Sequence, residues 1–306
     1  MLNATRLTYR INRFEVRAML TATAASVAVT AIVMSWIRSS GYAQCLGDVQ
    51  MSTVCFEQED IRRWATRVAG MSLQLAGAFP LLAGLLLGVP LISRELDKGT
   101  ARLAWSLAPS RGRWYVQRVM PILLLVGLTA LTIGLLAEQL TALFNPGIDL
   151  SNSFVTFRGR GVLLATSAML VGSVGVAVGA VIGRQIPTLV LALLLGGLTL
   201  LAIGEVDRKV LASEAVPLIG ENYYTHDLTM GEGRFQLPDG RLVTWDELVV
   251  IEPSAMNGEF NHPFIEFGIP RNRYQEIVAR EGVVQVVLSL GFLAVGAVVV
   301  GRRRPG

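Results

Sequence analysis

The chain has 306 residues, of which 52% are hydrophobic and 16% are charged. Soluble domains carry about 25% charged residues, so this composition excludes an ordinary soluble enzyme and indicates a protein embedded in a membrane. The net charge of +4 gives no reason to expect nucleic acid as a partner, because basic residues at the ends of apolar segments serve membrane topology.

Six runs without a charged residue divide the chain. They are residues 18–37, 69–92, 120–137, 162–183, 186–204 and 283–301. Each run has about the 17 to 25 residues that a helix needs to cross a bilayer. We therefore predict an all-α polytopic membrane protein with six transmembrane helices. Its expected parts are 1–17 before the first span, a body at 18–204, a polar segment at 205–282, and the last span with a basic tail at 283–306.

The segments on the two sides of these spans differ strongly in charge. Residues 1–17, 90–118, Arg184 and the C-terminal tail together hold 14 basic and 3 acidic residues, whereas the other side holds 13 basic and 20 acidic ones. Lys and Arg near span ends stay on the cytoplasmic side. Both termini are therefore predicted to be cytoplasmic, with a basic rim that faces anionic membrane lipid.

Residues 1–17 show two helical faces. Leu7, Ile11 and Phe14 share one face. The other face carries four arginines: Arg6, Arg10, Arg13 and Arg17. Such a helix lies in the membrane interface, with its apolar face at the acyl boundary and its arginines at the headgroups. The alternative is a simple positive anchor for the first span.

The first outside loop contains the two cysteines of the chain, Cys45 and Cys55. They are close in sequence and lie in a compartment that is expected to be oxidising, so we expect a disulfide. It would stabilise the loop by about 2 to 3 kcal/mol. The alternative is two free thiols.

A basic loop at 90–118 connects the second and third predicted spans. Apolar residues at spacings of four, three and four predict a short helix within it: Leu96, Thr100, Leu103 and Leu107. The opposite face is charged. Around this helix runs a recognisable series of residues: Glu95, Lys98, Gly99, Thr100, Leu103, Ser106, Arg111 and Trp114.

This series resembles the coupling helix of ABC-2 type transporter permeases, the transmembrane subunits of bacterial ABC exporters. The resemblance implies an ATPase-coupling surface within the loop at 93–118, formed by Arg94, Glu95, Lys98, Gly99, Thr100, Arg102, Leu103, Arg111 and Trp114. Arg94 and Glu95 would contact the ATPase, and Gly99 with Thr100 would form the turn and cap that orient the helix. The resemblance also implies that the N-terminal helix helps to hold the ATPase and that the protein resides in a bacterial cell membrane. The alternative for each charge is simple contact with solvent or lipid headgroups.

The fourth predicted span has small residues every three or four positions, a pattern of closely packed membrane helices. They are Gly172, Gly175, Gly179 and Gly183. The pattern fits packing within one protomer or between two protomers. Only Arg184 and Gln185 separate this span from the next, so the two spans are predicted to form a tight helical hairpin.

The polar segment at 205–282 is rich in aromatic residues and is predicted to form a small extracytoplasmic α/β lobe. Its Pro-Asp-Gly sequence at 238–240 predicts a β-hairpin. Thr244 and Glu247 match a capping box. The family resemblance also implies a short helix over 271–281 that dips into the membrane before the last span.

Residues for catalysis are not recognisable. His226 and His262 are far apart in sequence and lack metal-ligand spacing, so both are expected to be lone surface histidines. Glu138, near the outer end of the third span, is expected to reach water. The centres of the spans lack Asp, Glu, Lys and Arg, so a proton or sodium relay has no ionisable groups on which to run. A P-loop sequence is absent as well.

We therefore predict a permease subunit of an ATP-driven exporter rather than an enzyme. ATP and Mg²⁺ would bind a separate cytoplasmic ABC ATPase dimer, and a second copy of this chain or a related permease would complete the transporter. Spans without charge favour a lipophilic or amphiphilic substrate such as a drug, an antibiotic or a lipid. The alternative function is a non-transport membrane scaffold or receptor whose outer lobe binds a partner.

Overall fold

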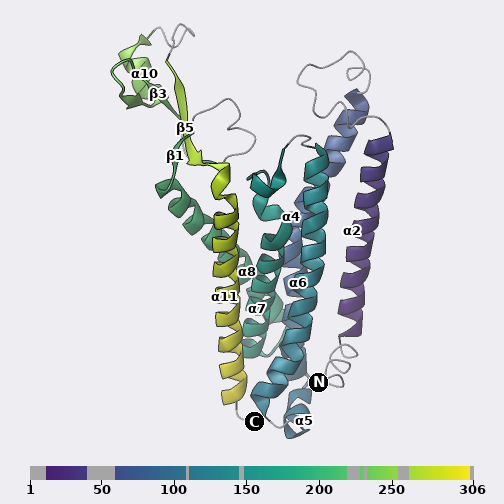
Figure 1. The fold of residues 1–306 in the computed structure, drawn as a ribbon. Helices are drawn as coiled ribbons and strands as arrows, with labels where there is room; N and C mark the ends of the chain where they lie inside the picture. The colour runs from purple at the N-terminus through teal and green to yellow at the C-terminus, as the bar shows by residue number, and fades with distance from the viewer. Residues whose placement is uncertain are drawn as a thin grey trace. The chain divides into compact units, whose positions relative to one another are not determined.

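The computed structural model describes residues 12–39, 59–107, 110–144, 148–218, 228–230, 233–253 and 262–303. Within these ranges the chain is mostly helical, and six helices are long and apolar enough to cross a membrane. They are α2 (Arg13–Ser39), α4 (Glu59–Asp97), α6 (Arg111–Phe144), α7 (Gly161–Ile182), α8 (Gln185–Ser213) and α11 (Tyr274–Arg302) (Figure 1). The predicted helical chain with six spans is confirmed.

The helices extend well beyond the charge-free runs in several places. α6 begins at Arg111, before the run at 120–137, and α4 continues to Asp97. With 39 residues, α4 is about 59 Å long at 1.5 Å per residue, which is about twice the thickness of the hydrocarbon core. The two helices therefore carry their charged ends to the short helix α5 (Thr100–Leu107) that lies between them.

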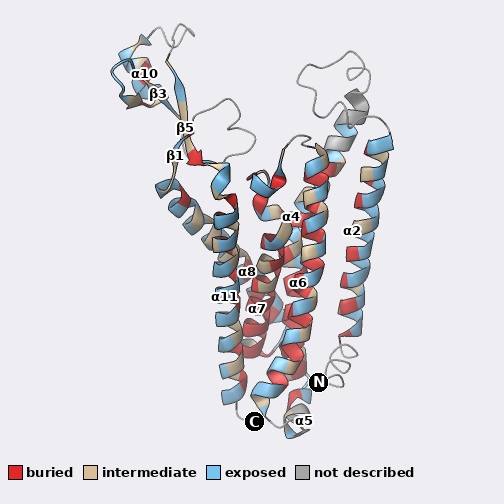
Figure 2. Cartoon of the chain, viewed as in Figure 1, coloured by how far each residue is buried: buried red, intermediate tan, exposed pale blue. Residues whose placement is uncertain are grey.

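Among the six spans, α7 is the most enclosed. Its most apolar stretch is 78% buried, against 17% for α8 and 22% for both α2 and α11. Figure 2 shows this difference as buried residues along α7 and exposed faces on the other three. α7 packs against α4 and α6, which also pack against each other. These three helices form the core of the membrane body, and the exposed faces of the others are apolar, as lipid contact requires.

The chain divides into two compact units, of which the second comprises residues 148–155 and 202–277. In the second unit, strand β5 (Phe264–Ile269) pairs antiparallel with three others: β1 (Val216–Leu218), β2 (Leu228–Thr229) and β3 (Arg234–Gln236). β3 also pairs with β4 (Leu242–Val243). A small core of Phe235, Leu237, Val243 and Leu248 holds this sheet to helix α10 (Trp245–Ile251).

Two local predictions for this unit are confirmed. The Pro-Asp-Gly turn joins β3 to β4, with Gly240 at φ +84°, a conformation that favours glycine. The capping box opens α10: the Glu247 N–H donates to Thr244 Oγ1 at 3.4 Å, and the Thr244 N–H donates to Glu247 Oε2 at 2.8 Å. This second hydrogen bond holds the pKa of Glu247 below its ordinary value.

The expected separate helix over residues 271–281 is wrong. After one 3₁₀ turn at Arg271–Arg273, α11 runs without a break to Arg302. Only Gly282 separates the amphipathic start of α11 from its apolar part, and a single glycine costs a helix only about 1 kcal/mol, so the helix continues.

Some predictions concern residues outside the described ranges. The disulfide expected between Cys45 and Cys55 belongs there, as do Arg6 and Arg10. Arg13 and Arg17 are described, and both are exposed in the first turns of α2. The boundary expected at residue 17 therefore lies within a continuous helix.

Candidate functional site

A sharp turn connects α4 to α5. Gly99 adopts φ +68°, in the left-handed region that glycine enters without a Cβ clash. Its N–H donates to the Leu96 carbonyl at 3.1 Å, and the Lys98 N–H donates to the Arg94 carbonyl at 3.1 Å. The Thr100 hydroxyl donates to the Glu95 carbonyl at 3.3 Å. The glycine thus ends α4, and the threonine ties the first residue of α5 back to it.

Aromatic contacts fasten α5 to the start of α6. The rings of Trp105 and Trp114 meet edge to face, with centroids 5.9 Å apart. The Arg111 guanidinium lies 4.9 Å from the centroid of the Trp105 ring, within the range of a cation–π interaction. Trp114 is only 5% exposed, so its indole belongs to the packing between helices and not to a lipid-facing belt.

A buried ion pair links the end of α4 to α6. Glu95 Oε1 lies 3.1 Å from Arg118 Nη2, and the two side chains are 9% and 8% exposed. The prediction that Glu95 contacts a partner directly needs an exposed carboxylate, whereas the structure places this side chain in the interior. In this arrangement of the helices the Glu95 carboxylate therefore faces Arg118 and not the surface.

Other charges of this connection reach two further helices. Arg94 Nη1 donates to Glu15 Oε1 of α2 at 2.8 Å. Arg111 Nη1 donates to the backbone carbonyls of Gly301, at 3.4 Å, and Arg303, at the end of α11. Lys98 is exposed, and the side chains of Arg102 and Leu103 lie outside what the structure describes. The connection is thus joined by side chains to α2, α6 and α11.

Several buried polar atoms around this connection lack a hydrogen-bond partner in the described part of the chain. They are Glu15 Oε2, Glu95 Oε2, Arg118 Nη1, Trp105 Nε1 and Trp114 Nε1. A buried polar group without a partner costs about 1 to 3 kcal/mol, so native structures keep few of them.

The predicted glycine stripe faces α4. A Cβ on Gly175 or Gly179 would lie 3.3 Å from backbone atoms of Val89, and a Cβ on Gly88 would lie 2.5 Å from the carbonyl oxygen of Gly172. Gly183 ends α7 at φ +71°. The α4–α7 contact therefore brings two backbones together within one chain, which the sequence pattern alone left open.

A polar network between α7 and α11 was not predicted. Gln285 Nε2 donates to Glu281 Oε1 at 3.4 Å, and Ser167 Oγ and Thr166 Oγ1 both donate to Gln285 Oε1, at 3.2 and 2.5 Å. Arg158 Nε lies 3.2 Å from Glu281 Oε1. Glu281 and Gln285 are 5% and 2% exposed. Their spacing of four residues, continued by Ser289, is a helical stripe that could have been recognised in the sequence.

Two further polar side chains, Glu138 and His262, form pairs that the sequence did not predict. Glu138 pairs with Arg160, with Oε1 3.2 Å from Nη1 and the arginine only 1% exposed. His262 Nε2 lies 2.7 Å from Glu252 Oε2, and the histidine side chain is 13% exposed. Glu138 itself is 32% exposed, so the expectation that it reaches water stays a prediction, whereas the expectation of a lone surface histidine at 262 is wrong. Within the described ranges, His, Cys, Asp and Glu form no group of three that could hold a metal ion.

One family model, described as ABC-2 membrane transporter related, matches residues 17–208. The matched range is more than half of the chain and contains the spans from α2 to most of α8, with the whole connection between α4 and α6. The β-strands lie outside it. No curated protein matches the chain.

Proposed function

The chain belongs to the family described as ABC-2 membrane transporter related, and from this we propose that it is the permease subunit of an ATP-driven exporter. Such a subunit is a multi-pass transport component and is not itself catalytic. ATP and Mg²⁺ would bind a separate cytoplasmic ATPase dimer. A second copy of this chain or a related permease would supply the other half of the transporter.

The connection between α4 and α6 carries this proposal. α5 is a short helix, held by the Gly99 turn and the contact of Trp105 with Trp114, between two helices that run the length of the membrane body. Its exposed neighbour Lys98 adds positive charge at this end of the helices. An ATPase surface with carboxylates would complement it.

The ion pairs support a mechanical role for this connection. A displacement of α5 by a moving ATPase would pass to α6 through Trp114, to α4 and α6 together through the Glu95–Arg118 pair, and to α2 through Arg94 and Glu15. α4 in turn lies against α7 at its glycines. In this account Glu95 is a positioning residue, because its pair with Arg118 holds α4 to α6.

The orientation and the substrate are part of the proposal. We place α5 and both termini in the cytoplasm of a bacterial cell, because basic residues predominate on that side, and the lobe predicted at 205–282 outside. Arg13 and Arg17 would then lie at the cytoplasmic headgroups. Ionisable side chains are absent from the centres of the spans, which favours a lipophilic or amphiphilic substrate such as a drug, an antibiotic or a lipid.

Copurification tests the proposal. The tagged chain, extracted in mild detergent from its native membrane, is expected to bring with it an ATPase that has a P-loop, in equal numbers of subunits. Recovery of the chain alone, with no nucleotide hydrolysis in the purified sample, would instead favour a scaffold or receptor.

A further inference from the structure

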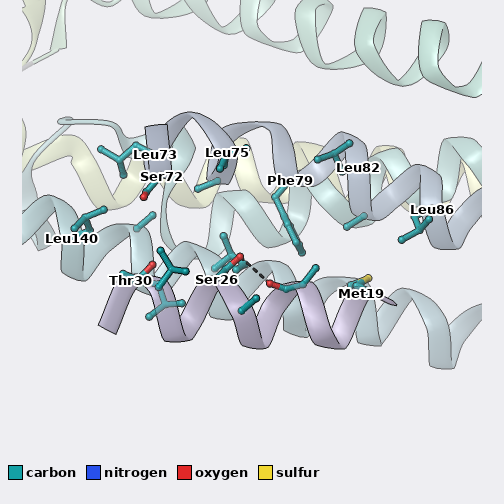
Figure 3. Close-up of a pocket in the computed structure, with 18 of the residues that line it drawn as sticks. Met19, Ser26, Thr30, Ser72, Leu73, Leu75, Phe79, Leu82, Leu86 and Leu140 are labelled. Atoms are coloured by element: carbon teal, nitrogen blue, oxygen red, sulfur yellow. Dashed lines mark hydrogen bonds between the residues drawn. The ribbon is translucent and has the colours of Figure 1, made fainter. Parts of the chain in front are cut away.

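The spans α2 and α11 contact the membrane body over a small part of their surface, since 22% of the apolar stretch of each is buried. For α2, a groove of about 390 Å³ lies between its middle and the helices α4 and α6. Figure 3 shows Phe79 reaching across this groove from α4 toward α2. Such helices depend on individual polar contacts near their ends, of which the pair of Glu15 with Arg94 is one for α2.

Two side chains of α6 bind the backbone of α11. The Tyr115 hydroxyl donates to the Leu293 carbonyl at 3.1 Å, and Gly296 allows this approach because a Cβ there would collide with the hydroxyl oxygen. Arg111, one turn earlier on α6, donates to two backbone carbonyls at the end of α11. Residues four apart share one face of a helix, so this face of α6 follows the last turns of α11.

The end of α11 in turn binds the end of α7. Arg303 Nη2 donates to the Val181 carbonyl at 2.8 Å. Carbonyls in the last turn of a helix have no partner within the helix, and they form the negative end of its dipole, so a guanidinium is stabilising there. Gly183, which ends α7 at φ +71°, leaves room for this guanidinium, because a Cβ at that position would lie 2.8 Å from Arg303 Nη1.

Asp97 at the end of α4 contacts the same turn between α7 and α8. Its Oδ2 accepts the Gln185 N–H at 3.5 Å, at the start of α8, where a helix presents unpaired N–H groups and the positive end of its dipole. The turn is thus held by a cation at the end of one helix and by an anion at the start of the next. Both contacts come from residues beside the connection, because Asp97 precedes the Gly99 turn and the Arg303 carbonyl accepts from Arg111.

We propose that residues 301–303 form a clasp that joins α6, α11 and α7, and that Arg303 is a positioning residue through which a displacement of α5 and the start of α6 reaches α7. The path begins at Trp105 of α5, whose indole centroid lies 4.9 Å from the Arg111 guanidinium. It continues from Arg111 over the end of α11 to Arg303 and the last turn of α7. The clasp rests on these contacts, whereas its use in transport rests on the proposed function.

Amide exchange at the end of α7 in the purified chain tests the clasp. Arg303→Met should quicken exchange in residues 180–184 about threefold, as expected when one cation is lost from a partly exposed helix end. Arg303→Lys, which keeps the charge, should retain most of the protection. The matched control Arg302→Met, at an exposed position of the same tail, should exchange like the unmodified chain. Equal exchange in the Arg303→Met and Arg302→Met variants would overturn the clasp.

Transmission from α6 is tested by Arg111→Met. Its side chain binds the end of α11, so its removal should release the tail and also quicken exchange at the end of α7. Because the two arginines act in series, Arg111→Met/Arg303→Met should exchange no faster there than Arg303→Met alone. Arg113→Met, at an exposed position of the same helix, is the control. Effects of Arg111→Met and Arg303→Met that multiply in the double variant would show two independent helix caps and would refute the positioning role.

The use of the clasp in transport is measured in vesicles that contain the copurifying ATPase. Arg303→Met should lose most of the substrate stimulation of ATP hydrolysis, whereas Arg302→Met and Arg303→Lys should keep it. Full stimulation in Arg303→Met would overturn the positioning role. If the unmodified chain never stimulates an ATPase, the proposed function fails, and the exchange measurements decide the clasp by themselves.

Discussion

Glu95 and Arg118 form an ion pair 3.1 Å long that is almost completely buried, and it joins the last turn of α4 to α6. Removal of one partner from a buried pair leaves the other charge without compensation, which destabilises a protein by about 3 to 5 kcal/mol. We expect Arg118→Met to lower the unfolding temperature strongly in detergent, and Glu95→Gln/Arg118→Met to recover part of the loss. Arg38→Met, at an exposed position, is the control. Equal melting of the Arg118 and Arg38 variants would contradict the burial of the pair.

The close approach of α4 and α7 gives a second prediction. A Cβ at position 88 would meet the Gly172 carbonyl oxygen at 2.5 Å, whereas one at position 77 of the same helix has nothing within 4 Å. Gly88→Ala should destabilise the chain by about 1 to 3 kcal/mol through overpacking. Gly77→Ala should leave stability unchanged or slightly raised. Thermal unfolding that does not separate the two variants would disprove the tight contact.

The polar network on α11 gives a third prediction. Gln285→Leu removes the group that accepts hydrogen bonds from Thr166 and Ser167, and hydrogen bonds between membrane helices contribute about 0.6 to 2 kcal/mol. A double-mutant cycle with Thr166→Val, measured by unfolding in mixed detergent, should give a coupling energy of at least about 0.5 kcal/mol. Strictly additive effects would mean that the two side chains do not interact.

The capping box of α10 gives a pH prediction. Folding lowers the pKa of Glu247, because the Thr244 N–H donates to its carboxylate. The resulting stabilisation is fully present above the ordinary Glu value of 4.5 and is lost as the pH falls through the lowered value. Amide exchange in α10, corrected for its intrinsic rate, should therefore quicken under acid. In Glu247→Gln this acid-induced change should be absent. If acid quickens amide exchange equally in Glu247→Gln and in the unmodified chain, the Glu247 carboxylate does not cause the pH dependence.

The sequence predicted the six spans because lack of charge over a membrane-crossing length is a local property. It did not predict where the helices end, because nothing in the backbone requires a helix to stop at the edge of the hydrocarbon. α4 and α6 continue to Asp97 and from Arg111, with charged residues that favour helix once they are in water. The hairpin at 238–240 and the capping box were also predicted from the sequence, because each depends on a few neighbouring residues.

The candidate site was predicted only in part, because its side chains pair over long distances in the sequence. Glu95 and Arg118 were both assigned to the basic loop at 90–118, but the structure places them on α4 and α6, and only the packing of these two helices brings the side chains together. The same holds for Glu281 and Arg158. A stripe of glycines likewise indicated close packing without indicating that α4 is the neighbour.

Reconstitution with the copurifying ATPase tests the central claim most directly. ATP hydrolysis is measured in vesicles with and without an added lipophilic substrate, for the unmodified chain, for Lys98→Glu beside α5, and for the matched control Arg38→Glu at the opposite end of α2. The account predicts that substrate stimulates hydrolysis for the unmodified chain and the Arg38 variant and that Lys98→Glu loses the stimulation while still inserting into the membrane. Two results would contradict the account. One is substrate stimulation of ATP hydrolysis in Lys98→Glu that equals that of the unmodified chain, and the other is a rate of hydrolysis by the ATPase that is the same with and without this chain.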